Sequence, residues 1–192
     1  IKRIFEDETE IIVKKKIEQK INENKHINKI GIKCKVPNQN EKVRIHIAME
    51  IILNMLIGES SNLYKEMYQT GNMFAMPNLS YEFGDNYAHI LITENANDPD
   101  ILFERLREEI ETFKKNGLNE EDFERTKKMI YGEYVKEYND VTSIARMFLS
   151  DFMKGINSFD YLEEVDIMDS NFVNQVLKDN FDLEKMVLSV VK

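Results

Sequence analysis

Few residues of this sequence have types and spacing that could support catalysis, and the histidines are the first to consider. There are three, His26, His46 and His89, and His46 is the one that lies in a predicted helix, with an acidic residue, Glu50, four positions later. Two such side chains on one helix face could supply half of a metal site. A mononuclear zinc peptidase site needs two histidines and a glutamate spaced as H-x-x-E-H or H-E-x-x-H, and the sequence contains neither. We therefore interpret His46 and Glu50 as a pair on the solvent face of a helix.

The segment IGESSNLYKEMYQTGNMF, residues 57–74, concentrates glycine, serine and tyrosine in one short stretch. It could be a phosphate-binding loop, a serine nucleophile site or a joint between two helices. Neither a G-x-S-x-G turn nor a G-x-x-x-x-G-K-[ST] motif is present in the sequence. Gly58 instead suits the end of one helix, and Ser60 or Ser61 suits the N-cap of the next. We predict a joint between helices.

The remaining reactive side chains have simpler interpretations. Cys34 alternates with Ile30 and Ile32 in a strand pattern, so we expect a buried, unreactive thiol. Three pairs of adjacent carboxylates lie in strongly polar helical segments, and they are Glu108–Glu109, Glu120–Glu121 and Glu163–Glu164. Such segments indicate solvated helix faces and not acid–base catalysis. The residue types alone therefore define no active site in this chain.

Hydrophobic periodicity shows which elements must position these residues. Alternating apolar residues predict strands, and apolar residues every three or four positions predict helices. The expected strands are 10–20, 29–36, 79–83, 87–93 and 186–191, with a hairpin turn at 84–86. The expected helices are 41–57, 61–70, 98–117, one long helix from Asn119 to Gly155, and two short helices at 161–165 and 170–178. This order predicts an α+β fold, a mostly antiparallel mixed sheet with helices layered on one face.

Composition and charge narrow the class of protein. The 192 residues suit one domain, with 42% hydrophobic and 32% charged residues, as is usual for globular proteins. Lysine and arginine total 26 against 35 acidic residues, and the net charge of −9 argues against nucleic-acid binding. The sequence shows no bilayer-spanning apolar run and no signal peptide, so we expect no membrane association. The single cysteine fits a reducing environment, and we expect a cytoplasmic location.

Three blocks of the sequence resemble the insulinase-like (pitrilysin-type) zinc metallopeptidases. LNMLIGESSNLYKEMYQTG is similar to the family pattern L-L-G-x-S-S-x-L-[FY]-x-E-L-R-E-x-G-L-A-Y. GLNEEDFERTKKMIYGEYVKEYND is similar to G-L-[ST]-E-E-[DE]-[FL]-E-R-A-K and the long helix that follows it. LEEVDIMDSNFVNQVLKDNFDLEKMVLSVVK is similar to the closing helices and last strand of the family domain. The resemblance is closest to the bacterial, processing-peptidase-like branch.

In that family each chain repeats an α+β domain of the processing-peptidase-like metallohydrolase fold. The first half carries H-x-x-E-H and a distal glutamate, and the second half usually lacks them. The resemblance implies that this chain is a second half, with no catalytic residue, metal or cofactor of its own and with zinc held by the N-terminal half. It further implies a linker at residues 1–10, beginning at Ile1 within a longer chain, and one peptidase-like domain at 11–192. The implied partners are the N-terminal half of the same polypeptide, a peptide substrate and a second peptidase-like subunit, identical or different.

Two positions depart from the family pattern. Members often carry an arginine and a tyrosine in the helix–loop region that contact the substrate or the reacting carbonyl, and Tyr68 and Phe74 stand at those positions here. An electrophilic role is therefore not carried over to this half. Tyr64, Tyr68, Phe74 and Tyr81 are the candidates to line a peptide groove, against the alternative that they pack between helices and sheet. A peptide could instead bind through main-chain hydrogen bonds along a sheet edge.

Three functions stay open on this basis. The SSNLY form of the turn favours the first, the non-catalytic C-terminal domain of an active zinc metalloendopeptidase. The second is a domain of an inactive peptidase-like partner subunit, and the presence of H-x-x-E-H in the N-terminal half distinguishes the two. The third is a stand-alone protein-interaction module, which a full-length chain starting near Ile1 with its own methionine would indicate.

Overall fold

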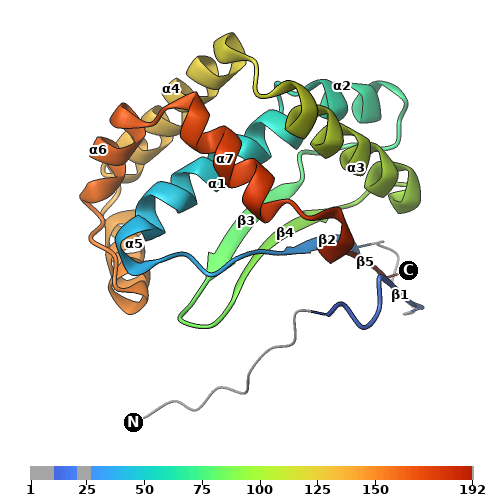
Figure 1. Ribbon diagram of the computed structural model, residues 1–192, viewed down its shortest axis with the longest axis horizontal. Coiled ribbons are helices and arrows are strands. Elements are labelled where there is room, and N and C mark those ends of the chain that lie inside the picture. Colours follow the sequence, from blue (N-terminus) through green and yellow to red (C-terminus); the bar gives the residue numbers. More distant parts are fainter. Residues whose placement is uncertain (1–10, 21–26, 192) are drawn as a thin grey trace.

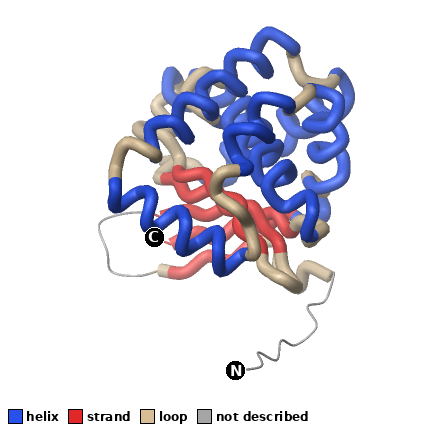
Figure 2. The backbone as a smooth tube through the Cα atoms, turned by 90° about the vertical axis from the view of Figure 1, so that its left-hand side faces the viewer, coloured by secondary structure: helices blue, strands red, loops and turns tan. Residues whose placement is uncertain are grey.

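The computed structural model describes residues 11–20 and 27–191, in which a layer of helices lies against one sheet (Figures 1 and 2). The strands are β1 (Lys16–Gln19), β2 (Ile27–Lys33), β3 (Asn78–Phe83), β4 (Ala88–Glu94) and β5 (Met186–Val191). The helices are α1 (Lys42–Ile57), α2 (Asn62–Gln69), α3 (Pro99–Asn116), α4 (Glu120–Glu137), α5 (Val141–Lys154), α6 (Asp160–Ile167) and α7 (Ser170–Asn180). The predicted α+β fold is confirmed, and the linker predicted at 1–10 lies outside the described residues. Within the described ranges, no helix has the length and apolar character needed to cross a membrane.

The described strands form one mixed sheet in the order β1-β5-β2-β4-β3. Its neighbouring pairs are antiparallel, except that β1 runs parallel to β5. Apolar alternation decides which face meets the helices, because Ile30 and Ile32 of β2 pair with Ile92 and Ile90 of β4 and all four are buried. Of the strand predicted at 10–20, only Lys16–Gln19 form a strand, β1, whose four residues are all exposed, and residue 10 lies outside the described residues.

The central helix of the layer is α1, whose apolar side chains are nearly all buried between the sheet and the other helices. Gly58 ends it, as predicted, and donates its N–H to the Asn54 carbonyl at 2.9 Å. A Cβ at Gly58 would lie 2.4 Å from that carbonyl oxygen, so a larger residue would clash there. Ser61 then caps α2, its Oγ accepting a hydrogen bond from the Tyr64 N–H at 3.1 Å. The predicted joint between helices is confirmed.

The single long helix predicted from Asn119 to Gly155 is wrong, because the chain turns between α4 and α5. Apolar residues recur at helical spacing on both sides of the turn and across it, so periodicity alone could not predict the turn. Asp140 begins α5 by accepting a hydrogen bond from the Ser143 N–H at 2.7 Å. Gly155 ends α5 in the left-handed conformation, with φ of 71°, as predicted for a helix stop. The turn carries the C-terminal end of α5 back to the start of α1.

Candidate functional site

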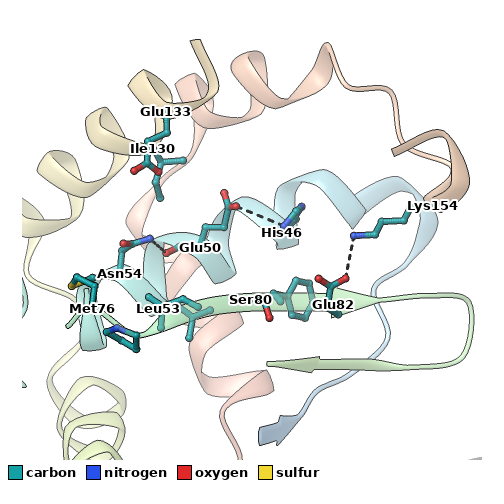
Figure 3. Close-up of a pocket in the computed structure, with 13 residues that line it drawn as sticks. His46, Glu50, Leu53, Asn54, Met76, Ser80, Glu82, Ile130, Glu133 and Lys154 are labelled. Atoms are coloured by element: carbon teal, nitrogen blue, oxygen red, sulfur yellow. Dashed lines mark hydrogen bonds and ion pairs between the residues drawn. The ribbon is translucent and has the colours of Figure 1, made fainter. Parts of the chain in front are cut away.

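A groove lies between α1, β3 and α4 and encloses about 390 Å³ (Figure 3). Two elements supply most of its polar lining: His46, Glu50 and Asn54 of α1, and Ser80, Tyr81 and Glu82 of β3. Residues 76 and 77, which precede β3, line one end. The groove therefore follows the direction of the strand.

The two ends of the groove differ in character. Met76 and Pro77 make one end apolar. At the other end, Lys154 at the close of α5 pairs with the Glu82 carboxylate, with 3.5 Å between Nζ and Oε2. Between them, Glu133 of α4 lies across the groove from Glu50 (Figure 3). The middle of the groove is thus lined by carboxylates, while its one lysine already has a partner.

His46 and Glu50 lie inside this groove, which corrects their interpretation as a solvent-facing pair. Their side chains are 18% and 34% exposed, and His46 Nε2 lies 3.8 Å from Glu50 Oε1. The rings of Tyr81, Phe83 and Tyr161 surround His46, with centroids 5.6 to 6.1 Å from the imidazole. Helical spacing identifies the pair, but only the packing of β3 and α6 around α1 removes it from water.

A chain of hydrogen bonds positions His46 on the Nδ1 side of its ring. Its Nδ1 lies 2.9 Å from the Tyr161 hydroxyl, and Tyr161 donates its O–H to Asp151 at 3.3 Å. Ser158 donates to the other Asp151 oxygen at 2.7 Å. Because the Tyr161 proton is used on Asp151, His46 completes the chain with its own proton on Nδ1. That tautomer leaves Nε2 as an acceptor facing Glu50.

Burial determines the protonation of the pair. Burial, and to a smaller extent the positive charge of Lys154, lowers the pKa of His46 to about 4. Burial raises the pKa of Glu50 to about 7, and the Glu133 carboxylate acts in the same direction. The Tyr134 hydroxyl opposes this rise by donating a hydrogen bond to Glu50 Oε2 at 2.7 Å. The groove therefore holds a neutral imidazole beside a carboxyl group that titrates near neutrality.

His46 and Glu50 do not extend to a metal site in this structure. A zinc ion is bound by at least three protein ligands even in catalytic sites. In ranges 11–20 and 27–191, no three histidine, cysteine, aspartate or glutamate side chains converge in a way that could hold a metal ion. The side chains that hydrogen-bond to His46 and Glu50 are those of Tyr161 and Tyr134. The arrangement suits hydrogen bonding and charge recognition.

The four aromatic residues predicted to line a peptide groove do not gather in one place. Tyr81 lines the β3 groove and is 3% exposed. Tyr64 and Tyr68 lie together on α2, with ring centroids 6.0 Å apart. Tyr68 and Phe74 are 57% and 65% exposed, and neither they nor Tyr64 line this groove. Substrate contact at any of the four stays a prediction.

Sequence reasoning missed Tyr134, Asp151, Lys154 and Tyr161 as parts of the site. They come from three helices and meet α1 only because the chain turns between α4 and α5, which no local spacing signals. The available signal was Tyr134, which lies at helical spacing from Phe123 and Ile130 and so was expected to be buried, since a buried hydroxyl requires a hydrogen-bond partner. The interpretation of Cys34 is confirmed, because it is buried and burial raises the pKa of its thiol to about 12.

The five-stranded mixed sheet and its helix layer have the architecture that the sequence analysis predicted for a peptidase-like domain. The family model described as the peptidase M16 inactive domain matches residues 4–130. The chain therefore belongs to the M16 peptidase family, as an inactive domain. The resemblance to the insulinase-like metallopeptidases is confirmed. No curated protein sequence matches the chain.

Solved structures share the fold over nearly the whole chain. An M16-like peptidase structure from Alicyclobacillus acidocaldarius has a TM-score of 0.84 at 22% identity and covers 92% of this chain and 43% of its own. A protease from Helicobacter pylori has a TM-score of 0.75 at 14% identity, covering 92% and 44%. The inactive peptidase domain of a zinc protease from Bordetella parapertussis has a TM-score of 0.70 at 11% identity, covering 90% and 92%. The chain thus spans under half the length of the first two relatives.

Proposed function

We propose that the chain is the non-catalytic C-terminal half of a zinc-dependent metalloendopeptidase and forms one wall of the chamber that encloses the peptide. The observation that carries this proposal is the match of residues 4–130 to the inactive domain of the M16 family. The relatives from Alicyclobacillus and Helicobacter, of which the chain spans 43% and 44%, support a longer polypeptide with a further half. In the proposed assembly that N-terminal half holds zinc, which activates the attacking water.

The surface of α5 supports a partner for this domain. Asp151 is the helix's only buried residue, and four apolar side chains are largely exposed: Val141, Leu149, Phe152 and Met153. We refer to these four as the α5 apolar face. Leu149 lies one helical turn before Phe152 and Met153, so these exposed apolar side chains lie near one another on the helix, as at interaction sites. We assign this face to contact with the N-terminal half of the same polypeptide.

Zinc content and peptidase activity test the proposal. The polypeptide that joins this chain to its N-terminal half should bind one zinc ion and cleave peptides, whereas this chain alone should do neither. Stoichiometric zinc in this chain, lost on His46→Ala, would contradict the assignment.

An inactive partner subunit is the second candidate, and the absence of zinc ligands from the described residues suits it equally. A joined polypeptide that binds no zinc, and gains activity only with a separate peptidase-like subunit, would establish this alternative.

A further inference from the structure

Helix α5 is attached to the rest of the domain with little burial of apolar surface. Asp151 is its only buried residue, and the side chains of the α5 apolar face are exposed. Among the described residues, the hydrophobic core and the half-buried apolar side chains packed against it include none from α5. Burial of apolar surface is the dominant force that holds packed elements together. Helix α5 must therefore be held mainly by other contacts.

Polar contacts from the start of α1 hold the C-terminal end of α5. Lys42, which is buried, donates a hydrogen bond from Nζ to the Lys154 carbonyl at 2.9 Å. Gln39, just before α1, donates from Nε2 to the Gly155 carbonyl at 2.8 Å. The last carbonyls of a helix have no partner within the helix, so these two side chains supply what α5 itself cannot.

The buried carboxylate of Asp151 makes the third attachment. It accepts a hydrogen bond from Ser158 Oγ at 2.7 Å and one from the Tyr161 hydroxyl of α6 at 3.3 Å. We refer to Gln39, Lys42 and Asp151 with these partners as the α5 latch. Water can replace each hydrogen bond of the latch when α5 moves away, so breaking the latch costs far less free energy than exposing an apolar face.

The position of α5 decides how open the surroundings of His46 are. Lys154 closes one end of the β3 groove, with its Nζ 3.5 Å from Glu82 Oε2 and 5.0 Å from the centre of the Phe83 ring (Figure 3). Ser150 and Lys154 of α5 also line a second recess, of about 510 Å³, and His46 lines both recesses. Helix α5 therefore supplies a wall on two sides of the imidazole.

We propose that α5 is a gate, which leaves the domain as one unit when the latch opens while the sheet and the other helices stay folded. Elements that bury little apolar surface open at a lower free energy than the whole domain unfolds. The opening withdraws Lys154 from Glu82 and joins the two recesses beside His46. The gate is a property of this chain and goes beyond the proposed function.

Hydrogen–deuterium exchange of this chain, followed by NMR at low urea concentrations, tests the gate. The urea dependence of exchange reports the surface that is exposed when an amide opens. We expect the amides of 145–154 to share one opening free energy with a shallow urea dependence, and to exchange at least about a hundredfold faster than those of 47–56 in α1. A free energy and urea dependence equal to those of α1 would overturn the proposal. So would protection that falls steadily from one end of α5 to the other, which indicates fraying.

Variants of the latch identify what holds the gate. Lys42→Met and Asp151→Asn should each speed exchange throughout α5 by about tenfold, since each weakens a hydrogen bond that only the closed position makes. The matched control is Lys65→Met, because Lys65 also donates from Nζ to a carbonyl, that of Ser60 at 2.8 Å, and should leave α5 unchanged. Gln39→Leu, at an exposed position, serves if circular dichroism shows that either latch variant is unfolded. Unchanged α5 exchange in folded latch variants would overturn the proposal.

The reactivity of His46 tests whether the movement of α5 opens the groove. Diethyl pyrocarbonate modifies neutral imidazoles, and mass spectrometry measures the rate at each histidine. His46 should react several-fold faster in Gln39→Leu and Lys42→Met than in the unaltered chain. His89, which stacks on Tyr87 with ring centroids 5.9 Å apart, should react at an unchanged rate. An unchanged rate at His46 in a variant whose α5 exchange is faster would show that α5 does not gate the groove.

Discussion

His46 and Glu50 respond to the same burial in opposite senses, because one is charged when it holds its proton and the other when it loses it. The folded chain therefore keeps His46 neutral in acid and Glu50 neutral towards pH 7. Tyr134 donates a hydrogen bond to Glu50 and Tyr161 donates one to Asp151. This protonation gives each of the two residues a characteristic dependence of stability on pH.

Replacement of Glu50 by glutamine should remove a loss of stability that occurs as the pH rises. Folded Glu50 keeps its proton to about pH 7, while the unfolded chain releases it near 4.5. Its contribution to the free energy of unfolding is therefore fully present below pH 4.5 and is lost as the pH rises to 7. Urea denaturation should show E50Q gaining on the unaltered chain between about pH 5 and about pH 8. Glu163→Gln, at an exposed position, is the control, and parallel curves for E50Q and the unaltered chain would contradict the prediction.

Replacement of His46 by asparagine should reduce the loss of stability that occurs in acid. The unfolded chain protonates His46 near pH 6.5 and the folded chain only near 4, so stability is present above 6.5 and is lost as the pH falls to 4. Asparagine can place its amide nitrogen where Nδ1 meets Tyr161 and does not titrate. The acid-induced loss measured by urea denaturation should be smaller in H46N. An imidazole whose ¹⁵N shifts show full protonation at about pH 6 in the folded chain would contradict the argument.

At the scale of elements, local sequence signals determine where the helices begin and end, and the packing of the helices determines the site. Helices begin or end at the capping residues that the sequence predicts, which are Gly58, Ser61, Gly117 and Gly155. The break between α4 and α5 could not be predicted, because apolar residues continue to recur every three or four positions across it. The groove depends on that break, since α5 supplies Lys154 to one end of it. Local chemistry therefore predicted the elements and their class, while the site required a turn whose effect is non-local.

The N-cap at Asp140 makes this break testable. Its carboxylate accepts the Ser143 N–H at 2.7 Å and starts α5 in a new direction. Asp140→Ala should lower the free energy of unfolding, whereas Asp140→Asn should keep most of it because asparagine caps nearly as well. Chemical denaturation followed by circular dichroism measures both. An alanine variant as stable as the unaltered chain would show that packing alone sets the turn.

At the scale of the whole molecule, α5 contributes both to the groove, through Lys154, and to the α5 apolar face. The β3 groove is a polar recess built on α1, and the α5 apolar face is an exposed surface on a helix that buries a single residue. Under the proposed function, this half would contribute binding surfaces to the peptidase and the N-terminal half would carry out hydrolysis.

Oxidation of methionine provides a test of the partner surface that needs no variant. Met153 belongs to the α5 apolar face and is 65% exposed, while Met129 on α4 is 40% exposed outside that face. If the N-terminal half covers α5, Met153 should be oxidised by dilute peroxide several-fold more slowly in the joined polypeptide than in this chain alone, because a covered thioether is withdrawn from the reagent. Met129 should react at the same rate in both, which mass spectrometry of the peptides can follow. Equal rates for Met153 in the two proteins would place the partner elsewhere on the molecule, and equal slowing of both methionines would indicate a general change in reactivity and not contact at α5.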